Sequence, residues 1–427
     1  MDKNDHKTSQ IVYVTRDIER ALGLMPGENF HIVTNRTEYS ETVKKQFRDY
    51  VTLIDPISDG RTMATESLKV HDLLDTNQLL ETPVMEKLMT KDRSILVFKC
   101  NKLIESIATK KGWHLLNPSA DLAEKIENKI SAVEWLGELG VKYLPPHIVC
   151  ATKDMKWSKE PLVIQWAHGH TGDSTSLVNS NEELAAIQAK FPERMARATS
   201  FVRGPSFTLN IVVTKDDVYT GNISYQITGM PPFTENPFST IGNDWSLTHS
   251  LLSDKEIDTI SDMAREIGQK MAKDGWCGMC GIDVIRDDER GQIYLIEINA
   301  RQPASTTFES FLQQENRRSG VVGITIFEAY IKALLGEKIE SPIVHINDGA
   351  QIIKRVAKGQ TSTQSNFIAD DVIGALQLSG YKVIQYPNTE YNEDQLRIQS
   401  MKGIMESHFK LNSRGKEIAD ALQMRTN

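Results

Sequence analysis

Short apolar runs alternate with amphipathic stretches in the N-terminal part of the chain. Four runs rich in Val, Ile and Leu predict strands, at residues 11–14, 30–34, 51–54 and 94–99. Apolar residues recur at helical spacing between them, at residues 40–49 and 79–90. Strands alternating with helices predict a small parallel α/β domain that ends near residue 117. No Gly-x-Gly-x-x-Gly motif follows the first strand, so no dinucleotide site is expected there.

Beyond residue 117 the pattern is more varied. An amphipathic helix is expected at residues 123–139, and the Pro- and Gly-rich loop 228–245 is expected to form a wall of the acceptor-substrate pocket. Further strands are predicted at residues 141–149, 162–165, 207–213, 218–227 and 349–356. Further helices are predicted at residues 181–190, 254–274, 307–314, 324–335, near 395–408 and at the C-terminal end.

One stretch, residues 281–306, combines a clear strand pattern with chemically active side chains. Its apolar positions predict two strands joined by a polar turn. Side chains two apart on a strand share a face, so Glu297, Asn299 and Arg301 are expected to point the same way, with Asp283 on the neighbouring strand. Two carboxylates and an amide oxygen suit Mg²⁺, and an arginine suits a phosphate that the ion bridges.

The alternative for this hairpin is an exposed polar face with no ligand, which is common in antiparallel pairs. The nearly continuous apolar run around Glu297, with the sequence YLIEIN, instead indicates a strand that is buried on both faces. Buried carboxylates need partners, which favours a metal–phosphate site.

Composition and charge narrow the function. The chain has 427 residues, 40% of them hydrophobic, and a net charge of −8. An acidic chain is not expected to bind nucleic acid, and no apolar run reaches the roughly 18 residues of a membrane span. The polar N-terminus lacks a signal-peptide pattern, so we expect a cytoplasmic protein. Cys277 and Cys280 have the spacing of a redox or zinc pair, but the other two cysteines are isolated, which favours core cysteines.

The order of several motifs resembles the ATP-grasp superfamily. Gly-Ile-Asp283 followed by Glu297-x-Asn299-x-Arg301 is similar to the metal-binding end of that family. Upstream, Lys129 follows an Asn-Pro-Ser sequence, where family members carry a lysine that reaches an ATP phosphate. A strand ending at Gln165 precedes a glycine-rich loop, as in the family's lid.

The resemblance implies a two-lobed domain that binds ATP and Mg²⁺, with Mn²⁺ as an alternative ion. The metal ligands would be Asp283, Glu297 and Asn299, and the catalytic residues would be Glu297, Arg301 and Arg355. The nucleotide-binding residues would be Lys129, Gln165, Gly169, His170, Thr171, Gly172, Ser174, Thr175 and the hinge residues Phe201 and Val202 before Gly204. Four features depart from the family pattern. Asn128 replaces an aspartate before Lys129, and Gln165 replaces a lysine. The lid loop offers His168 and His170 rather than Arg or Lys, and the segment 197–200 lacks a glutamate that often contacts adenine or ribose.

The expected architecture has three parts. An N-terminal parallel α/β domain (1–117) is followed by an ATP-grasp domain (118–340), made of a lid (about 143–203) and an antiparallel core sheet. A small mixed α+β region (341–427) completes the chain. Small molecules are the expected partners, and a homodimer is compatible with the sequence.

The resemblance implies a ligase that joins a carboxylate to an amine through an acyl phosphate. One alternative is a biotin-carboxylase-like enzyme, because the strand that ends at Arg355 is similar to one in that group. However, Ser305 stands where a catalytic glutamate is expected, and Lys402 lacks the flanks of a biotin site. A second alternative is a nucleotide-binding regulatory protein without turnover, given Gln165 and the missing glutamate.

Overall fold

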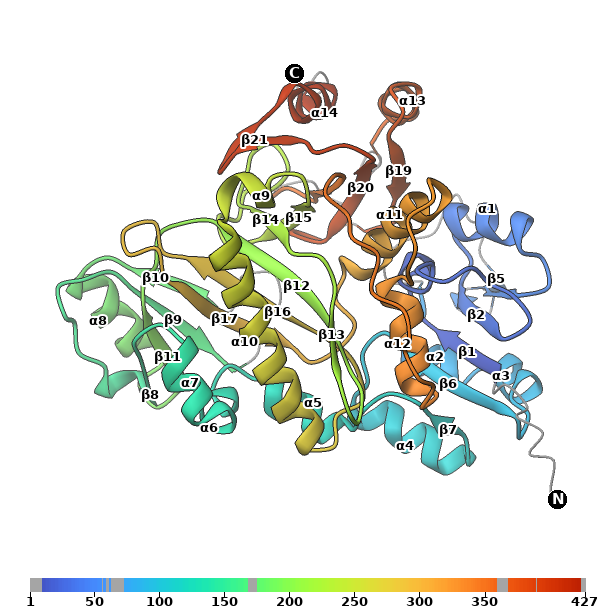
Figure 1. Cartoon of the computed structure of the whole chain (residues 1–427), viewed down its shortest axis with the longest axis horizontal. Helices are drawn as coiled ribbons and strands as arrows, with labels where there is room; N and C mark the ends of the chain where they lie inside the picture. Colours follow the sequence, from blue (N-terminus) through green and yellow to red (C-terminus); the bar gives the residue numbers. More distant parts are fainter. Residues whose placement is uncertain are drawn as a thin grey trace.

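The computed structural model describes residues 10–55, 57–58, 61–62, 73–167, 175–358, 368–388 and 390–423. The N-terminal strands lie at one side of the molecule and a small antiparallel sheet at the other, with a large central sheet between them (Figure 1). The expected α/β class is confirmed, with a parallel sheet at the N-terminus and antiparallel sheets beyond it.

The N-terminal sheet is parallel throughout and has the strand order β3-β2-β1-β6-β7. Its strands are β1 (Gln10–Val14), β2 (Phe30–Asn35), β3 (Val51–Ile54), β6 (Arg93–Val97) and β7 (His114–Leu115). Its helical elements are η1 (Ile18–Ala21), α1 (Glu38–Gln46), α2 (Thr76–Leu80), α3 (Pro83–Leu88) and α4 (Lys102–Lys111), and β4 (Ile57–Ser58) pairs with β5 (Arg61–Thr62). The single helix predicted at 79–90 is wrong, because Pro83 begins a new helix rather than continuing the old one.

Three short helices lead from this sheet into the rest of the chain: α5 (Ala120–Glu127), α6 (Ser131–Leu136) and α7 (Glu138–Tyr143). The prediction of one helix at 123–139 is wrong. Asn128 has an extended backbone, and its side chain accepts a hydrogen bond from the N–H of Ile130 at 3.0 Å, which starts the next helix. Gly137, at φ 56°, then separates α6 from α7. The strand predicted at 141–149 is correspondingly shorter and begins only after Pro145 and Pro146.

The lid is a four-stranded antiparallel sheet with the order β10-β9-β11-β8. Its strands are β8 (His147–Ala151), β9 (Leu162–Trp166), β10 (Thr175–Val178) and β11 (Met195–Ser200), and they are joined by η4 (Thr152–Asp154) and α8 (Asn181–Lys190). Ile164, Trp166 and Leu184 belong to its small separate core.

The central sheet has nine strands, eight of them in the order β17-β16-β12-β14-β15-β18-β20-β19, with β13 paired to β12. They are β12 (Ser206–Val213), β13 (Val218–Thr220), β14 (Ser224–Thr228), β15 (Thr240–Asp244), β16 (Gly278–Arg286), β17 (Ile293–Asn299), β18 (Ala350–Arg355), β19 (Lys382–Gln385) and β20 (Asp394–Ser400). The expected hairpin of β16 and β17 is confirmed. Three other expectations are wrong: 218–227 is two strands, the loop 228–245 contains β15, and the helix near 395–408 is β20.

Helices cover both faces of this sheet. Ile211 faces the long helix α10 (Asp254–Lys273), whereas its neighbour Val212 packs with Phe327 of α12 (Ile326–Leu334) and with Ile11 of β1. The cluster around α12 therefore fixes the N-terminal sheet against the central sheet. Cys280 is fully buried in the core beside α10, in agreement with a core cysteine.

The C-terminal strands β18 to β20 continue the central sheet instead of forming a sheet of their own. The remaining elements are α9 (Thr248–Leu251), α11 (Thr306–Arg318), α13 (Asp370–Leu378), β21 (Met405–Ser407), β22 (Lys410–Leu411) and α14 (Ser413–Gln423). Within the described ranges, no helix has both the length and the apolar character needed to cross a membrane.

Candidate active site

A cavity of about 330 Å³ opens between the lid sheet and the central sheet. Its polar floor carries Asp283, Glu297, Asn299 and Arg301, together with Lys129 from the segment between α5 and α6. The structure therefore brings together the side chains that the hairpin pattern predicted. Its other walls come from the lid strands, the hinge after β11 and the loop before β15.

Two carboxylates face each other on the floor. Asp283 and Glu297 are direct partners in the register of β16 and β17. Asp283 accepts hydrogen bonds from Thr208 Oγ1 at 2.8 Å and from Asn299 Nδ2 at 3.1 Å. Burial and the adjacent charge of Glu297 raise the pKa of Asp283 to about 7. In the free protein Asp283 is therefore only partly ionised at neutral pH, whereas Glu297 is ionised.

Two cations, Lys129 and Arg301, act on the Glu297 carboxylate. Lys129 Nζ lies 3.1 Å from Glu297 Oε2, and only 11% of the lysine side chain is exposed. Burial alone would raise the pKa of Glu297, but the charges of Lys129 and Arg301 keep it below its ordinary value. Arg301 forms an ion pair with Glu127, which also pairs with Lys99. Lys129 is thus a buried site residue and not a solvated helix lysine.

The donors on the floor fit a hard divalent cation. Oxygen atoms of Asp283, Glu297 and Asn299 share one side of the hairpin, and burial beside the charge of Glu297 raises the pKa of Asp283. No three His, Cys, Asp or Glu side chains converge on one point anywhere in the described ranges. Any bound Mg²⁺ would therefore complete its oxygen shell with the amide of Asn299, phosphate oxygens and water.

The charge that Gln165 lacks comes from the neighbouring strand. Arg197 on β11 is the direct register partner of Gln165 on β9, and both line the cavity. Arg197 Nη2 donates to Gln165 Oε1 at 2.6 Å and to the carbonyl of Ile296 at 2.9 Å. Burial lowers the pKa of Arg197 to about 10, which leaves it charged at neutral pH. Sequence reasoning missed this residue, although the strand pairing could have revealed it.

The hinge between lid and core closes one end of the cavity. Phe201 and Val202 line it, as expected, but the N–H of Phe201 donates to the carbonyl of Pro161 at 3.0 Å. Phe201 can therefore offer a ligand its carbonyl but not its N–H. Gly204 is required here: at φ 147°, a Cβ would lie 1.9 Å from the carbonyl oxygen of Arg286.

The apolar side chains that the core hairpin adds to the walls were not predicted, whereas the loop 228–245 was expected to line a substrate pocket. Ile285 and Leu295 from the core hairpin and Phe238 from the loop before β15 line the same cavity as the hinge. Apolar side chains beside backbone polar groups suit a flat heteroaromatic ring. The loop 228–245 thus contributes to this cavity, through Phe238 and Thr240.

Comparison with known proteins agrees with this geometry. Residues 126–305 match the family model described as the ATP-grasp domain. This part of the chain is an ATP-grasp domain. No curated protein sequence matches the chain.

Solved structures with the same fold cover nearly the whole chain. Carboxyaminoimidazole ribonucleotide synthase from Aspergillus clavatus, complexed with ATP, is 13% identical at a TM-score of 0.61 and covers 97% of this chain and 98% of its own. Biotin carboxylase from Campylobacter jejuni is 13% identical at 0.59, covering 93% and 89%. Phosphoribosylamine–glycine ligase from Thermotoga maritima is 13% identical at 0.59, covering 96% of both chains. At such identities the likeness establishes the fold.

The expected lid-loop residues are only partly described. Gly169, His170, Thr171, Gly172 and Ser174 of the ATP-grasp lid loop fall outside the described residues, whereas Thr175, at the start of β10, lines the cavity.

Arg355 is not part of the cavity lining. Its guanidinium donates to Asp394 and to the carbonyls of Asn392 and Thr240, each at 2.8 Å, and its side chain is 7% exposed. The structure therefore does not bring Arg355 together with the other candidate catalytic residues.

Proposed function

We propose that this chain is an ATP-dependent ligase that joins a small carboxylate to an amine through an acyl phosphate. The observation that carries the proposal is the floor of the ATP-grasp cavity, where Asp283 and Glu297 face each other beside Lys129 and Arg301. This arrangement suits the phosphates of ATP and their metal ion. Proteins of similar fold include a synthase solved in complex with ATP and a phosphoribosylamine–glycine ligase.

Nucleotide binding divides the cavity into two ends. The adenine would lie against Leu295, Phe238 and the hinge, and the phosphates would extend toward Arg197, Lys129 and Arg301. Asp283, Glu297 and Asn299 would hold Mg²⁺, which neutralises phosphate charge when bound. Mn²⁺, another ion that suits oxygen ligands, would fit the same donors.

The chemical steps balance without any further reactant. A carboxylate oxygen of the substrate attacks the γ-phosphorus of ATP, and the bond to the bridging oxygen breaks, so that ADP leaves with the electron pair. The amine nitrogen then attacks the carbonyl carbon of the acyl phosphate, phosphate leaves, and the nitrogen loses a proton. Lys129 and Arg301 would stabilise the charge that spreads over the transferring phosphoryl oxygens.

Ser305 supports a ligase over a biotin-carboxylase-like enzyme. It is buried, and its hydroxyl donates to Asn210 Oδ1 at 3.1 Å, so no carboxylate occupies the position where that group has a catalytic glutamate.

The proposed division at residues 117 and 340 keeps all the floor residues within the ATP-grasp part.

A test measures ADP release with a panel of small acids and amines, alone and in pairs. We expect release that requires one acid and one amine, and a loss of about a hundredfold or more in Arg301→Gln because a charge-assisted contact to the phosphoryl group is removed. Arg290→Gln is the matched control, since Arg290 lies in the turn of the same hairpin with 68% of its side chain exposed. ATP hydrolysis that no acid–amine pair changes would show that the protein is not such a ligase.

A further inference from the structure

A second and smaller cavity, of about 30 Å³, lies where three distant parts of the chain meet. Glu19 and Arg20 come from η1 and Tyr39 from α1, both in the N-terminal part of the chain. Thr307 and Phe311 come from α11, and Gln351, Lys382 and Arg397 from strands β18 to β20. It has room for one small polar group.

The second cavity lies beside the segment that follows Arg301, because Ala304 and Thr307 line it. The turn that follows Arg301 is fastened to the N-terminal sheet, because Gln302 Nε2 donates to the carbonyl of Arg20 at 2.7 Å. Thr307 Oγ1 donates to the same carbonyl at 3.3 Å, and Tyr13 donates to Gln302. A ligand in the second cavity would therefore lie next to the segment that carries Arg301.

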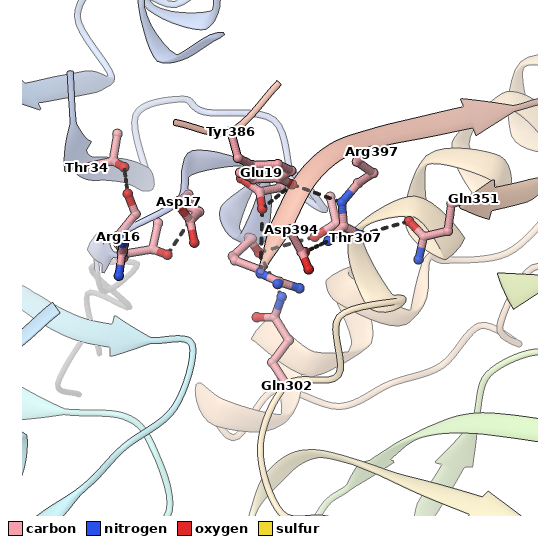
Figure 2. A network of polar contacts seen from close by, with 12 residues as sticks. Arg16, Asp17, Glu19, Thr34, Gln302, Thr307, Gln351, Tyr386, Asp394 and Arg397 are labelled. Atoms are coloured by element: carbon pink, nitrogen blue, oxygen red, sulfur yellow. Dashed lines mark hydrogen bonds and ion pairs between the residues drawn. The ribbon is translucent and has the colours of Figure 1, made fainter. Parts of the chain in front are cut away.

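Part of the polar lining is already satisfied. Arg397 donates to Tyr386 at 2.9 Å, to Gln351 at 3.1 Å and to Asp394 at 3.3 Å (Figure 2). Tyr386 in turn donates to Glu19 at 2.7 Å. These contacts hold Arg397 and Glu19 in place and leave them few free positions for a ligand.

The other two cations are not satisfied. Arg20 lies 3.7 Å from Glu19 through Nε, but its Nη1 is buried without a hydrogen-bond partner. Lys382 Nζ lies 5.8 Å from the ring of Tyr39 and 5.5 Å from that of Phe311, and within the described part of the chain it makes no ion pair. Three cations, Arg20, Lys382 and Arg397, line this cavity, and the carboxylates that act on them are Glu19 and Asp394. Lys382 is an exposed residue at the edge of this cavity, whereas Arg20 Nη1 is buried and needs a hydrogen-bond acceptor.

We infer that the second cavity binds an oxyanion group of a substrate, a carboxylate or a phosphate, through Arg20 and Lys382. This inference rests on the proposed function only in taking the ligand to be a substrate of the ligase. Anchored there, the substrate would present its reacting end on the side of Arg301. Tyr39 and Phe311 beside the lysine would pack against the carbon atoms next to the anionic group.

The experiment titrates the full-length protein with sodium acetate, succinate and inorganic phosphate at constant ionic strength, with chloride as the reference. A non-hydrolysable ATP analogue and Mg²⁺ are present at saturation, so that the ATP-grasp cavity cannot bind the probes. We expect saturable binding of at least one probe to the wild type. Comparing the affinities for acetate and succinate with the affinity for phosphate distinguishes a carboxylate site from a phosphate site.

The variants locate the site. Lys382→Met should weaken binding at least about tenfold, which is the usual effect of losing one charged hydrogen bond, and Lys382→Arg should retain it. Lys358→Met is the matched control, because Lys358 also lies over a tyrosine ring, at 5.2 Å from Tyr391, outside this cavity.

Three results would overturn the inference: no probe binding above chloride, equal binding by wild type and Lys382→Met, or an equal loss in Lys358→Met. If a probe binds as expected but no pair of an acid and an amine stimulates ADP release, the proposed ligase activity is refuted while the anion site stands.

Discussion

Asp283 offers a direct physical test of the floor of the ATP-grasp cavity. The substitution Asp283→Asn keeps the shape of the side chain but removes its charge. In the metal-free protein that charge is unfavourable, because Asp283 is buried and faces Glu297. When Mg²⁺ and nucleotide bind, the same charge becomes favourable. The substitution should therefore stabilise the free protein at alkaline pH while weakening its response to ligands.

The magnitude follows from the pKa of Asp283, which rises from 3.8 to about 7. A carboxyl whose folded pKa is raised contributes its stability fully below pH 4 and loses that stability as the pH rises to 7. Each pH unit is worth about 1.36 kcal/mol, so the loss is about 1.6 kcal/mol by pH 5 and on the order of 4 by pH 8. Asp283→Asn should remove the difference of about 2–3 kcal/mol between these pH values.

The assay is a pair of melting curves, at pH 5 and pH 8, on metal-free protein in a chelator. For a chain of this length, 1 kcal/mol corresponds to about 1 °C, so Asp283→Asn should gain about 2–3 °C relative to the wild type between the two pH values. The amide also weakens one hydrogen bond, to Thr208 or Asn299, but this cost is nearly equal at both pH values and cancels.

Asp287→Asn is the matched control on the same hairpin. Burial would raise the pKa of Asp287, but the N–H groups of Glu289 and Arg290 keep it below its ordinary value. A carboxylate with a lowered pKa stabilises the folded protein at every pH above the ordinary pKa of aspartate, and this stabilisation is lost only at lower pH. Both pH 5 and pH 8 lie above that pKa, so Asp287→Asn should lower the stability equally at the two pH values. Equal behaviour of the two variants, or unchanged Mg²⁺–nucleotide stabilisation in Asp283→Asn, would refute the facing-carboxylate account.

Two further predictions concern the cations of the floor. Glu297→Gln removes the ion-pair partner of Lys129, so the melting temperature of the free protein should fall by about 1–3 °C, opposite in sign to the effect of Asp283→Asn. Turnover should also be lost. An unchanged melting temperature would show that the ion pair is not formed. Arg197→Met should weaken binding of a non-hydrolysable ATP analogue by about tenfold or more in calorimetry. Adding Gln165→Lys to that variant should restore part of the affinity, and wild-type affinity of Arg197→Met alone would show that its charge faces away from the phosphates.

The fold was predictable where the pattern was local and regular. The β16–β17 hairpin, α8, α10 and the N-terminal strands follow directly from alternation or helical spacing in the sequence. The errors occurred where one side chain or a distant partner decides the structure. Asn128 ends a helix whose amphipathic pattern continues past it. Residues 394–400 form a strand because β18 and β19 supply pairing partners on both sides.

The site was predictable where its residues lie on one hairpin. Asp283, Glu297 and Asn299 converge as the strand period requires. Their ion pairs were not predictable, because Arg301 pairs with Glu127 and Glu297 with Lys129, across more than a hundred residues of sequence. Arg20 and Lys382 of the second cavity are separated still further, and neither belongs to a recognisable motif.

Gln165 shows why a single position can mislead. ATP-grasp proteins usually have a lysine at the end of this strand, and Gln165 lacks its charge. In the structure the same face of the lid sheet still carries a cation, because Arg197 is the cross-strand partner of Gln165 and their side chains are hydrogen-bonded. Paired positions on adjacent strands share one face and lie about 5 Å apart, so a charge can move between them with little change in the field at the ligand. The phosphate subsite that we propose requires a positive charge on this face of the lid, and either strand can supply it. Gln165 is therefore not evidence against catalysis unless Arg197 is also absent.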